Sequence, residues 1–238
     1  GKSLTLIAAS RPVPGRVGAI VVAAGTSKRM GSADKIFSEL LGRPLVSYSL
    51  SVLLQSKLVD EAILVVADHN IKKAEVLLRE AYPEGQVQLC IGGERRQDSV
   101  RLGLDLLPHC DWIVIHDGAR PCLDELILWR GLDAAQHTGA AIPVIPISDT
   151  LKQISDQHLV SATVDRNSFW ATQTPQVFRR EILVRAHQQI THHVTDDSGM
   201  LELLGYQVRV FDGETTNLKV TTPPDLKIAE ELLRARAI

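Results

Sequence analysis

The sequence predicts an α/β fold built on a twisted, mostly parallel β-sheet with helices on both faces. Three short, apolar, β-branched runs predict buried strands: residues 17–24, 62–67 and 112–116. Apolar residues recur with helical spacing in the stretches between and after these runs: Val46, Leu50, Leu53 and Leu54 in one, Val100, Leu104 and Leu107 in the next. Strand–helix–strand units of this length form right-handed crossovers between parallel strands, which is a Rossmann-like arrangement.

The composition limits what such a chain can do. It has 238 residues, of which 45% are hydrophobic and 23% charged, and this balance excludes wholesale disorder. The net charge of −2 argues against binding duplex nucleic acid, whose partners carry a basic excess. No apolar run is long enough for a membrane span or a signal peptide, and the three cysteines show no CxxC spacing. We therefore expect no nucleic-acid or membrane partner and a cytoplasmic location, or a stroma-like one in a plastid-bearing organism.

The chain divides into a tail, one domain and an arm. Residues 1–16 are rich in proline and glycine near their end and are expected to be a flexible N-terminal tail, with a single domain over residues 17–238. Two strand-like pieces, residues 150–154 and 159–164, flank a polar turn and predict a β-hairpin arm at about residues 147–172. Helices are expected again at residues 180–189 and 197–204, and after the Pro223-Pro224 pair.

A loop of small and basic residues follows the first predicted strand. Ala23, Ala24 and Gly25 open it, and basic side chains follow at Lys28, Arg29 and Lys35. Small residues at the carboxyl end of a strand let backbone N–H groups approach phosphates, and the cations add charge. The spacing matches neither a Walker A loop nor a GxGxxG turn. The sequence therefore indicates a phosphate site of another kind.

Five motifs, in order, resemble those of one family. They are Ala23-Ala24-Gly25 with Arg29-Met30-Gly31 and Lys35; Gly92–Val100; His116–Pro121; Thr163–Asn167 with Thr174-Pro175-Gln176; and Asn217–Thr221. The first resembles the signature loop of nucleotidyltransferases that activate sugars and polyols. Together they resemble the 2-C-methyl-D-erythritol 4-phosphate cytidylyltransferases of non-mevalonate isoprenoid synthesis over about residues 17–236. The resemblance implies that CMP passes from CTP to that polyol phosphate and that pyrophosphate leaves.

The resemblance, with the chemistry of the residues, gives a candidate site. The catalytic cations are expected to be Arg29 and Lys35. The CTP site is expected to comprise Ala23, Ala24, Gly25, Gly92, Gly93, Arg96, Ser99 and Asp117. The phosphate of the acceptor is expected to contact Thr150, Arg166, Lys219, Arg120 and Thr174. The Gly92-Gly93 backbone could read the edge of a pyrimidine, although a glycine turn before a helix is the simpler interpretation of that pair taken alone.

Asp117 is also the candidate metal ligand. It ends the third predicted strand, facing the basic loop, where a carboxylate suits Mg²⁺ or another divalent cation that bridges phosphate oxygens. The alternative is a helix cap, but Asp124 is better placed to cap the next helix.

Two other functions stay open. Ribitol-5-phosphate cytidylyltransferases share the CTP half of the site, and a catalytically silent nucleotide-binding module could use the same fold for assembly. Family resemblance also implies a homodimer in which the arm reaches the neighbouring subunit.

Overall fold

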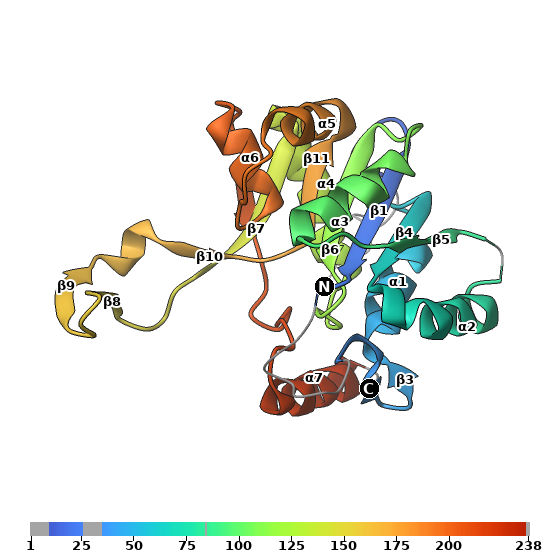
Figure 1. Ribbon diagram of the computed structural model, residues 1–238, viewed down its shortest axis with the longest axis horizontal. Coiled ribbons are helices and arrows are strands. Elements are labelled where there is room, and N and C mark those ends of the chain that lie inside the picture. The colour runs from blue at the N-terminus through green and yellow to red at the C-terminus, as the bar shows by residue number, and fades with distance from the viewer. Residues whose placement is uncertain (1–9, 26–34, 84, 237–238) are drawn as a thin grey trace.

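The computed structural model describes residues 10–25, 35–83 and 85–236 and is organised around one eight-stranded sheet (Figure 1). The strand order is β10-β7-β11-β6-β1-β4-β5, with β12 paired to β7. The strands are β1 (Val17–Ala23), β4 (Glu61–Val66), β5 (Val87–Ile91), β6 (Trp112–Asp117), β7 (Ala140–Pro146), β10 (Trp170–Thr172), β11 (Gln176–Arg179) and β12 (Arg209–Asp212). The three strands predicted from apolar runs form the centre of this sheet as β1, β4 and β6.

The sheet is mostly parallel. β1 pairs in parallel with β4 and β6, and Ile20 aligns with Ile63 on one side and Ile115 on the other. β4 pairs in parallel with β5, and β7 with β12. β11 lies between β6 and β7 and runs against both, and β10 runs against β7 at the edge. The carboxyl ends of β1, β4 and β6 therefore meet at one edge, where ligands bind in open α/β sheets.

Helices cover both faces of the sheet, as predicted. They are α1 (Leu45–Gln55), α2 (Ile71–Ala81), α3 (Arg96–Asp105), α4 (Glu125–Thr138), α5 (Arg180–Gln189), α6 (Asp197–Leu203) and α7 (Pro223–Arg236). Side chains of α1, α2 and α4 share one buried cluster with Val17, Ala19 and Val21 of β1. Those of α3, α5 and α6 share another with Ile20. The alternation along β1 follows from the two-residue period of a strand.

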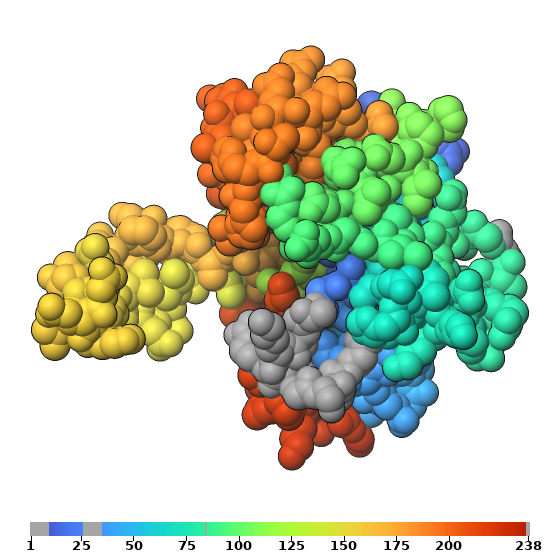
Figure 2. Space-filling view, viewed as in Figure 1, coloured from blue at the N-terminus to red at the C-terminus, as the bar shows by residue number. Residues whose placement is uncertain are grey.

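The predicted arm is present and stands out from the body (Figures 1 and 2). β8 (Leu151–Ile154) and β9 (Val160–Val164) form an antiparallel hairpin with a register shift at Gln153/Ile154. The chain returns through a short 3₁₀ turn, η5 (Arg166–Ser168), and β10. Large apolar side chains at Ile154, Leu159 and Val160 are more than half exposed on this hairpin.

The expected N-terminal tail differs from what the structure shows over residues 10–16. Val13 is buried, and Arg11 forms an ion pair with Asp60 at 2.8 Å. The carbonyl of Pro14 accepts a hydrogen bond from Trp112 Nε1 at 3.1 Å. This segment packs on the body because Val13 is buried there and both of its arginines form ion pairs, Arg11 with Asp60 and Arg16 with Glu61. Residues 1–9 lie outside the described part of the chain.

Smaller elements complete the molecule. A 3₁₀ turn, η3 (Lys35–Phe37), precedes a two-stranded ribbon of β2 (Glu39–Leu40) and β3 (Arg43–Pro44), and η4 (Asp68–Asn70) precedes α2. α7 packs on Leu40, Leu45 and Cys122 through Ala229. Within the described residues, none of the helices combines the length and apolar character that crossing a bilayer requires.

Candidate active site

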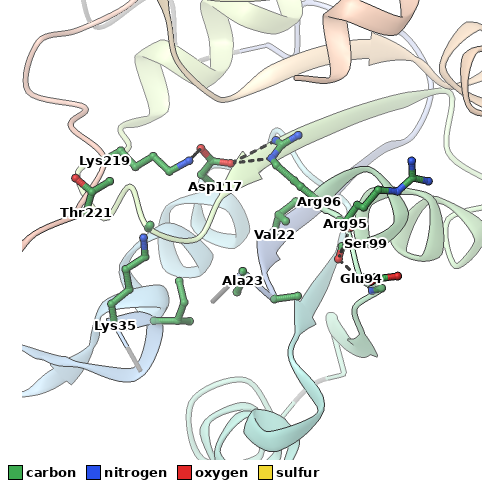
Figure 3. Close-up of a pocket in the computed structure, with 15 residues that line it drawn as sticks. Val22, Ala23, Lys35, Glu94, Arg95, Arg96, Ser99, Asp117, Lys219 and Thr221 are labelled. Atoms are coloured by element: carbon green, nitrogen blue, oxygen red, sulfur yellow. Dashed lines mark hydrogen bonds and ion pairs between the residues drawn. The ribbon is translucent and has the colours of Figure 1, made fainter. Parts of the chain in front are cut away.

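A pocket of about 400 Å³ opens at the carboxyl edge of the central strands (Figure 3). Five segments line it: the end of β1 at residues 22–25, Lys35 and Ile36 of η3, residues 93–96 with Ser99 at the start of α3, Asp117 and Ala119 at the end of β6, and residues 219 and 221. The sheet topology thus joins residues that are up to about 200 positions apart in the sequence.

Asp117 is the centre of charge in this pocket. Its Oδ2 lies 3.0 Å from Lys219 Nζ and 3.6 Å from Arg120 Nε, and its Oδ1 lies 3.3 Å from Arg96 Nη2. Burial alone would raise the pKa of this carboxyl group, but the charges of Arg96, Lys219 and Arg120 outweigh burial and hold the pKa well below its usual range. Asp117 is therefore ionised at neutral pH and organises three cations around one carboxylate.

Arg96 is held from two sides. Its Nε and Nη2 each lie 3.3 Å from Asp117 Oδ1, and its Nη1 donates to Asp197 Oδ2 at 2.6 Å. Burial lowers the pKa of the guanidinium, but the charges of Asp197 and Asp117 raise it above its ordinary value. The side chain is nevertheless 30% exposed, toward the pocket. Arg96 thus presents a fixed positive charge to a ligand.

The backbone of the glycine pair before α3 lies close to neighbouring side chains. A Cβ on Gly92 would lie 2.4 Å from the Ala24 Cβ and 2.8 Å from Ser99 Oγ, so a larger residue would displace the β1 loop. Ser99 Oγ accepts the Gly93 N–H at 3.1 Å and fixes the turn. Gly93 and Ser99 line the pocket, whereas Gly92, which was also expected to contact CTP, does not. Recognition of the base by this turn stays a prediction.

A chain of buried hydrogen bonds holds the backbone of Asp117. The Asp117 N–H donates to Thr174 Oγ1 at 3.0 Å, and Thr174 Oγ1 lies 3.1 Å from His116 Nδ1. His116 Nε2 lies 3.1 Å from the Arg120 carbonyl, which can only accept, so Nε2 carries the proton and Nδ1 accepts from the threonine. Burial lowers the pKa of His116 to about 4, so the ring is neutral at pH 7. Thr174 therefore contacts the backbone of Asp117 and does not line the pocket.

Arg120 is also largely enclosed. It is 8% exposed, and its Nη1 donates to the Asn217 carbonyl at 2.7 Å. Burial lowers the pKa of this guanidinium, against the opposing charge of Asp117. The Val220 N–H donates to the Ala119 carbonyl at 2.8 Å, so the segment that carries Lys219 is fixed beside the loop that follows β6. Arg120 therefore ties the C-terminal segment to the Asp117 loop.

The remaining predicted residues fall into three places. Ala23, Ala24, Gly25 and Lys35 line the pocket, and the Lys35 ammonium points toward Lys219 and Thr221 (Figure 3). Thr150 and Arg166 are exposed at the arm, outside this pocket, and Arg166 Nη1 donates to the Ser148 carbonyl. Arg29 lies outside the described residues.

Two residues that sequence reasoning did not select belong to this arrangement. Asp197 contacts Arg96 directly but follows a polar stretch that reads as an ordinary helix start. Thr221 lines the pocket and donates through its hydroxyl to Asp225 Oδ2 at 2.8 Å. Thr221 was within reach of the sequence, because it ends the Asn217–Thr221 motif. Asp197 gave no signal, because only the tertiary structure brings it to Arg96.

The pocket offers the Asp117 carboxylate as a protein ligand for a divalent cation. Among the described residues, no group of three or more His, Cys, Asp or Glu side chains could hold a metal. Asp117 already contacts three cations, which oppose a further positive charge. Mg²⁺ is often bound by one or two carboxylates with the phosphates of the substrate. The donor set therefore fits a metal that arrives with phosphate oxygens.

A cation-rich pocket at the carboxyl edge of a doubly wound sheet is typical of α/β enzymes that bind phosphorylated substrates. The family model of 2-C-methyl-D-erythritol 4-phosphate cytidylyltransferase (IspD) matches residues 17–235. The chain belongs to this family. Membership confirms the cytidylyltransferase activity expected from the motifs, in isoprenoid precursor synthesis.

Relatives agree along nearly the whole chain. The enzyme of this name from Dehalococcoides mccartyi is 46% identical over 219 residues, covering 92% of this chain and 96% of the relative. That from Syntrophus aciditrophicus is 40% identical over 225 residues, covering 92% and 96%. The crystal structure of 4-diphosphocytidyl-2C-methyl-D-erythritol synthase from Anaerococcus prevotii has a TM-score of 0.81 at 29% identity, covering 92% of this chain and 99% of that one.

Proposed function

We propose that the pocket around Asp117 transfers CMP from CTP to 2-C-methyl-D-erythritol 4-phosphate, with the described residues divided between a nucleotide half and an acceptor half. The observation that carries this division is the Asp117 carboxylate, with Arg96 on one oxygen and Lys219 on the other. Arg96 belongs to the first turn of α3, and Lys219 belongs to the C-terminal segment on another side of the pocket. We assign Arg96 to CTP and Lys219 to the acceptor.

The nucleotide half comprises the β1 loop, the glycine turn and Arg96. Ala23, Ala24 and Gly25 offer backbone at the end of a parallel strand, which suits phosphate oxygens. Gly93 and Ser99 line the pocket on this side, and we assign this wall to the cytosine base. Lys35, together with Arg29, is assigned to the triphosphate and to the charge that develops at its α-phosphorus.

The acceptor half comprises Lys219 and Arg120 in one chain and residues of the arm. Thr150 and Arg166 are assigned to the same phosphate, but within one chain they lie on the arm, away from the pocket. The exposed apolar side chains of the hairpin support a homodimer in which the arm supplies these contacts to the neighbouring subunit. Thr174 acts on this half through the Asp117 backbone. We place the reaction in the cytoplasm.

The chemistry needs positioning more than proton transfer. An oxygen of the acceptor phosphate is already ionised at neutral pH and attacks the α-phosphorus of CTP in line, forming a new P–O bond as the bond to pyrophosphate breaks. No general base is required, so the cations act by orienting the two phosphates and by stabilising the transition state. Asp117 would hold Mg²⁺, which when bound neutralises charge on the phosphate oxygens.

Pyrophosphate release tests this function. CTP with 2-C-methyl-D-erythritol 4-phosphate should release pyrophosphate, and ribitol 5-phosphate should be a much poorer acceptor. ATP and GTP should be poor donors because a purine base is larger than the pyrimidine for which we assign the space beside the glycine turn. Equal rates with ribitol 5-phosphate would favour the alternative polyol, equal rates with ATP would remove the assignment of the turn, and no release with either acceptor would indicate a silent module.

A further inference from the structure

The first turn of α3 is fastened to the segment before and at the start of α6 by three consecutive side chains. Arg95 Nη1 donates to the Thr191 carbonyl at 2.9 Å, and Gln97 Nε2 donates to the Ile190 carbonyl at 2.8 Å. Between them, Arg96 Nη1 donates to Asp197 Oδ2 at 2.6 Å. Two of these contacts reach backbone, whereas the contact of Arg96 reaches a charged side chain.

Asp197 lies behind the arginine, on the side away from the ligand space. Its side chain is 1% exposed, and it does not line the pocket. The ion pair that the described residues give it is the one with Arg96. A charge buried to this degree is stable only when it is paired, so its place in the structure depends on the arginine.

The geometry of Arg96 depends on Asp197 in turn. The contacts of the guanidinium with Asp117 are both 3.3 Å, longer than the contact with Asp197. Charge-assisted contacts near 2.7 Å are the strong ones. The shorter bond fixes one nitrogen of the planar group and thereby sets the direction in which the other two face.

We propose that Asp197 is a positioning residue that holds Arg96 in the orientation that binds CTP. It touches neither substrate in this arrangement and acts only through the guanidinium. The proposal rests on the assignment of Arg96 to CTP above. Loss of the carboxylate leaves Arg96 attached to Asp117 alone, free to turn toward that residue and away from the nucleotide phosphates.

Asp197→Asn tests this, because it removes the charge and preserves the size of the side chain. The dissociation constant of CTP, measured by calorimetry with Mg²⁺ on the full chain, should rise about tenfold. The KM for CTP should rise with it, and the KM for the acceptor should stay unchanged. Asp60→Asn is the control for loss of an Asp–Arg ion pair far from the pocket, because it breaks the more exposed pair with Arg11 at the opposite end of β1. It should leave CTP binding unaltered.

A double-mutant cycle separates positioning from general damage. In an Arg96→Ala background, Asp197→Asn should have no further effect on CTP affinity, because its route of action is gone. Additive losses would overturn the proposal, as would unchanged CTP affinity in a folded Asp197→Asn protein. If Asp197→Asn does not fold, Asp197→Glu keeps the charge and moves the carboxylate by one methylene. It should also weaken CTP binding, and unchanged affinity in that variant would overturn the proposal.

The Arg96→Ala variant separates the role of Arg96 from that of Asp197. If Arg96→Ala binds CTP as well as the wild type, the assignment of Arg96 to CTP fails, and the inference falls with it. If Arg96→Ala weakens CTP binding and Asp197→Asn does not, the proposed function stands and the role of Asp197 alone is rejected.

Discussion

One carboxylate decides the chemistry of this site at the scale of the residue. Asp117 ends a fully buried strand, with its N–H on Thr174 and its two oxygens facing different cations. A residue with this many partners has little freedom, so it places Arg96 and Lys219 before either substrate arrives. Such preorganisation lowers the reorganisation needed in the transition state. Two predictions concern single side chains around it.

Lys35→Ala should slow the reaction without unfolding the protein. Lys35 reaches into the pocket from η3, so its loss removes one charge near the reacting phosphates (Figure 3). We expect kcat to fall about 10²- to 10³-fold, with a nearly unchanged melting temperature. Lys72→Ala, on the exposed side of α2, is the control and should alter neither quantity. A large drop in melting temperature with normal kcat would assign Lys35 to structure.

His116 should make the protein less stable as the pH falls below 6.5. Burial holds its pKa at about 4, against 6.5 for an ordinary histidine, so the unfolded chain takes up the proton first. Stability is therefore fully present above pH 6.5, falls between about pH 6.5 and pH 4, and levels off below. The shift corresponds to a loss of ~3 kcal/mol in the free energy of unfolding.

Urea unfolding of the wild type and His116→Asn across this range measures that loss. The wild type should lose more stability between pH 7.5 and pH 4 than the variant, by that amount. Replacement of the exposed His109 by Asn should leave the wild-type dependence in place. Parallel pH curves for the wild type and His116→Asn would contradict the buried neutral ring.

At the scale of the element, the arm stands apart from the central sheet (Figure 2). Within the described residues, β8 and β9 pair with each other and with no other strand. Ile154, Leu159 and Val160 on this hairpin are more than half exposed. A two-stranded hairpin is marginal alone in water, so a partner surface would stabilise it. The same element carries Thr150 and Arg166, which connects assembly to the acceptor site.

Leu159→Asp should weaken the proposed dimer. Leu159 is 62% exposed on the arm, and burying a leucine at an interface contributes about 1.5–3 kcal/mol. Each arm carries one Leu159, so the dissociation constant of the dimer, measured by analytical ultracentrifugation, should rise by at least about 10- to 150-fold. Ile228→Asp is the matched control, since Ile228 is 53% exposed on α7, and it should leave the dimer intact. Equal effects of both changes would show that the arm has no special role.

At the scale of the whole molecule, the two candidate cations of the acceptor lie in different environments of one chain. Lys219 reaches Asp117 in the pocket, whereas Arg166 is exposed at the arm. A site that needs both is completed most simply by two subunits. In the proposed dimer, catalysis would therefore depend on assembly.

Mixing two inactive variants tests this arrangement. Arg166→Ala and Lys219→Ala should each lower kcat/KM for the acceptor about 10- to 150-fold, with CTP binding nearly unchanged. In a heterodimer, one site carries both lesions and the other carries neither, so activity should return in part. A confirmed heterodimer without recovered activity would mean that each chain builds its acceptor site alone. Calorimetry that shows lost CTP affinity would reassign these cations.

Local patterns in the sequence were enough to predict the central strands, the hairpin and several helices, and to indicate the edge of the sheet at which the pocket lies. Apolar runs predicted β1, β4 and β6 because their residues are buried on both faces, and this burial is visible without knowledge of the partner strands. Gly92-Gly93 and the position of Asp117 after β6 indicated the ligand edge. The hairpin and α5 were also predicted within a residue or two, because their turns and periodicity are local.

Which distant residues meet became visible in the tertiary structure alone. It inserted β11 between β6 and β7, placed Thr174 beneath Asp117 and brought Asp197 to Arg96. It also packed residues 10–16 on the body, where the composition had predicted a tail. Strand order and ion pairing depend on contacts between segments far apart in the chain, and local periodicity does not predict these contacts. The sequence therefore shows that Arg96 and Asp197 are charged, but only the structure shows that they form an ion pair.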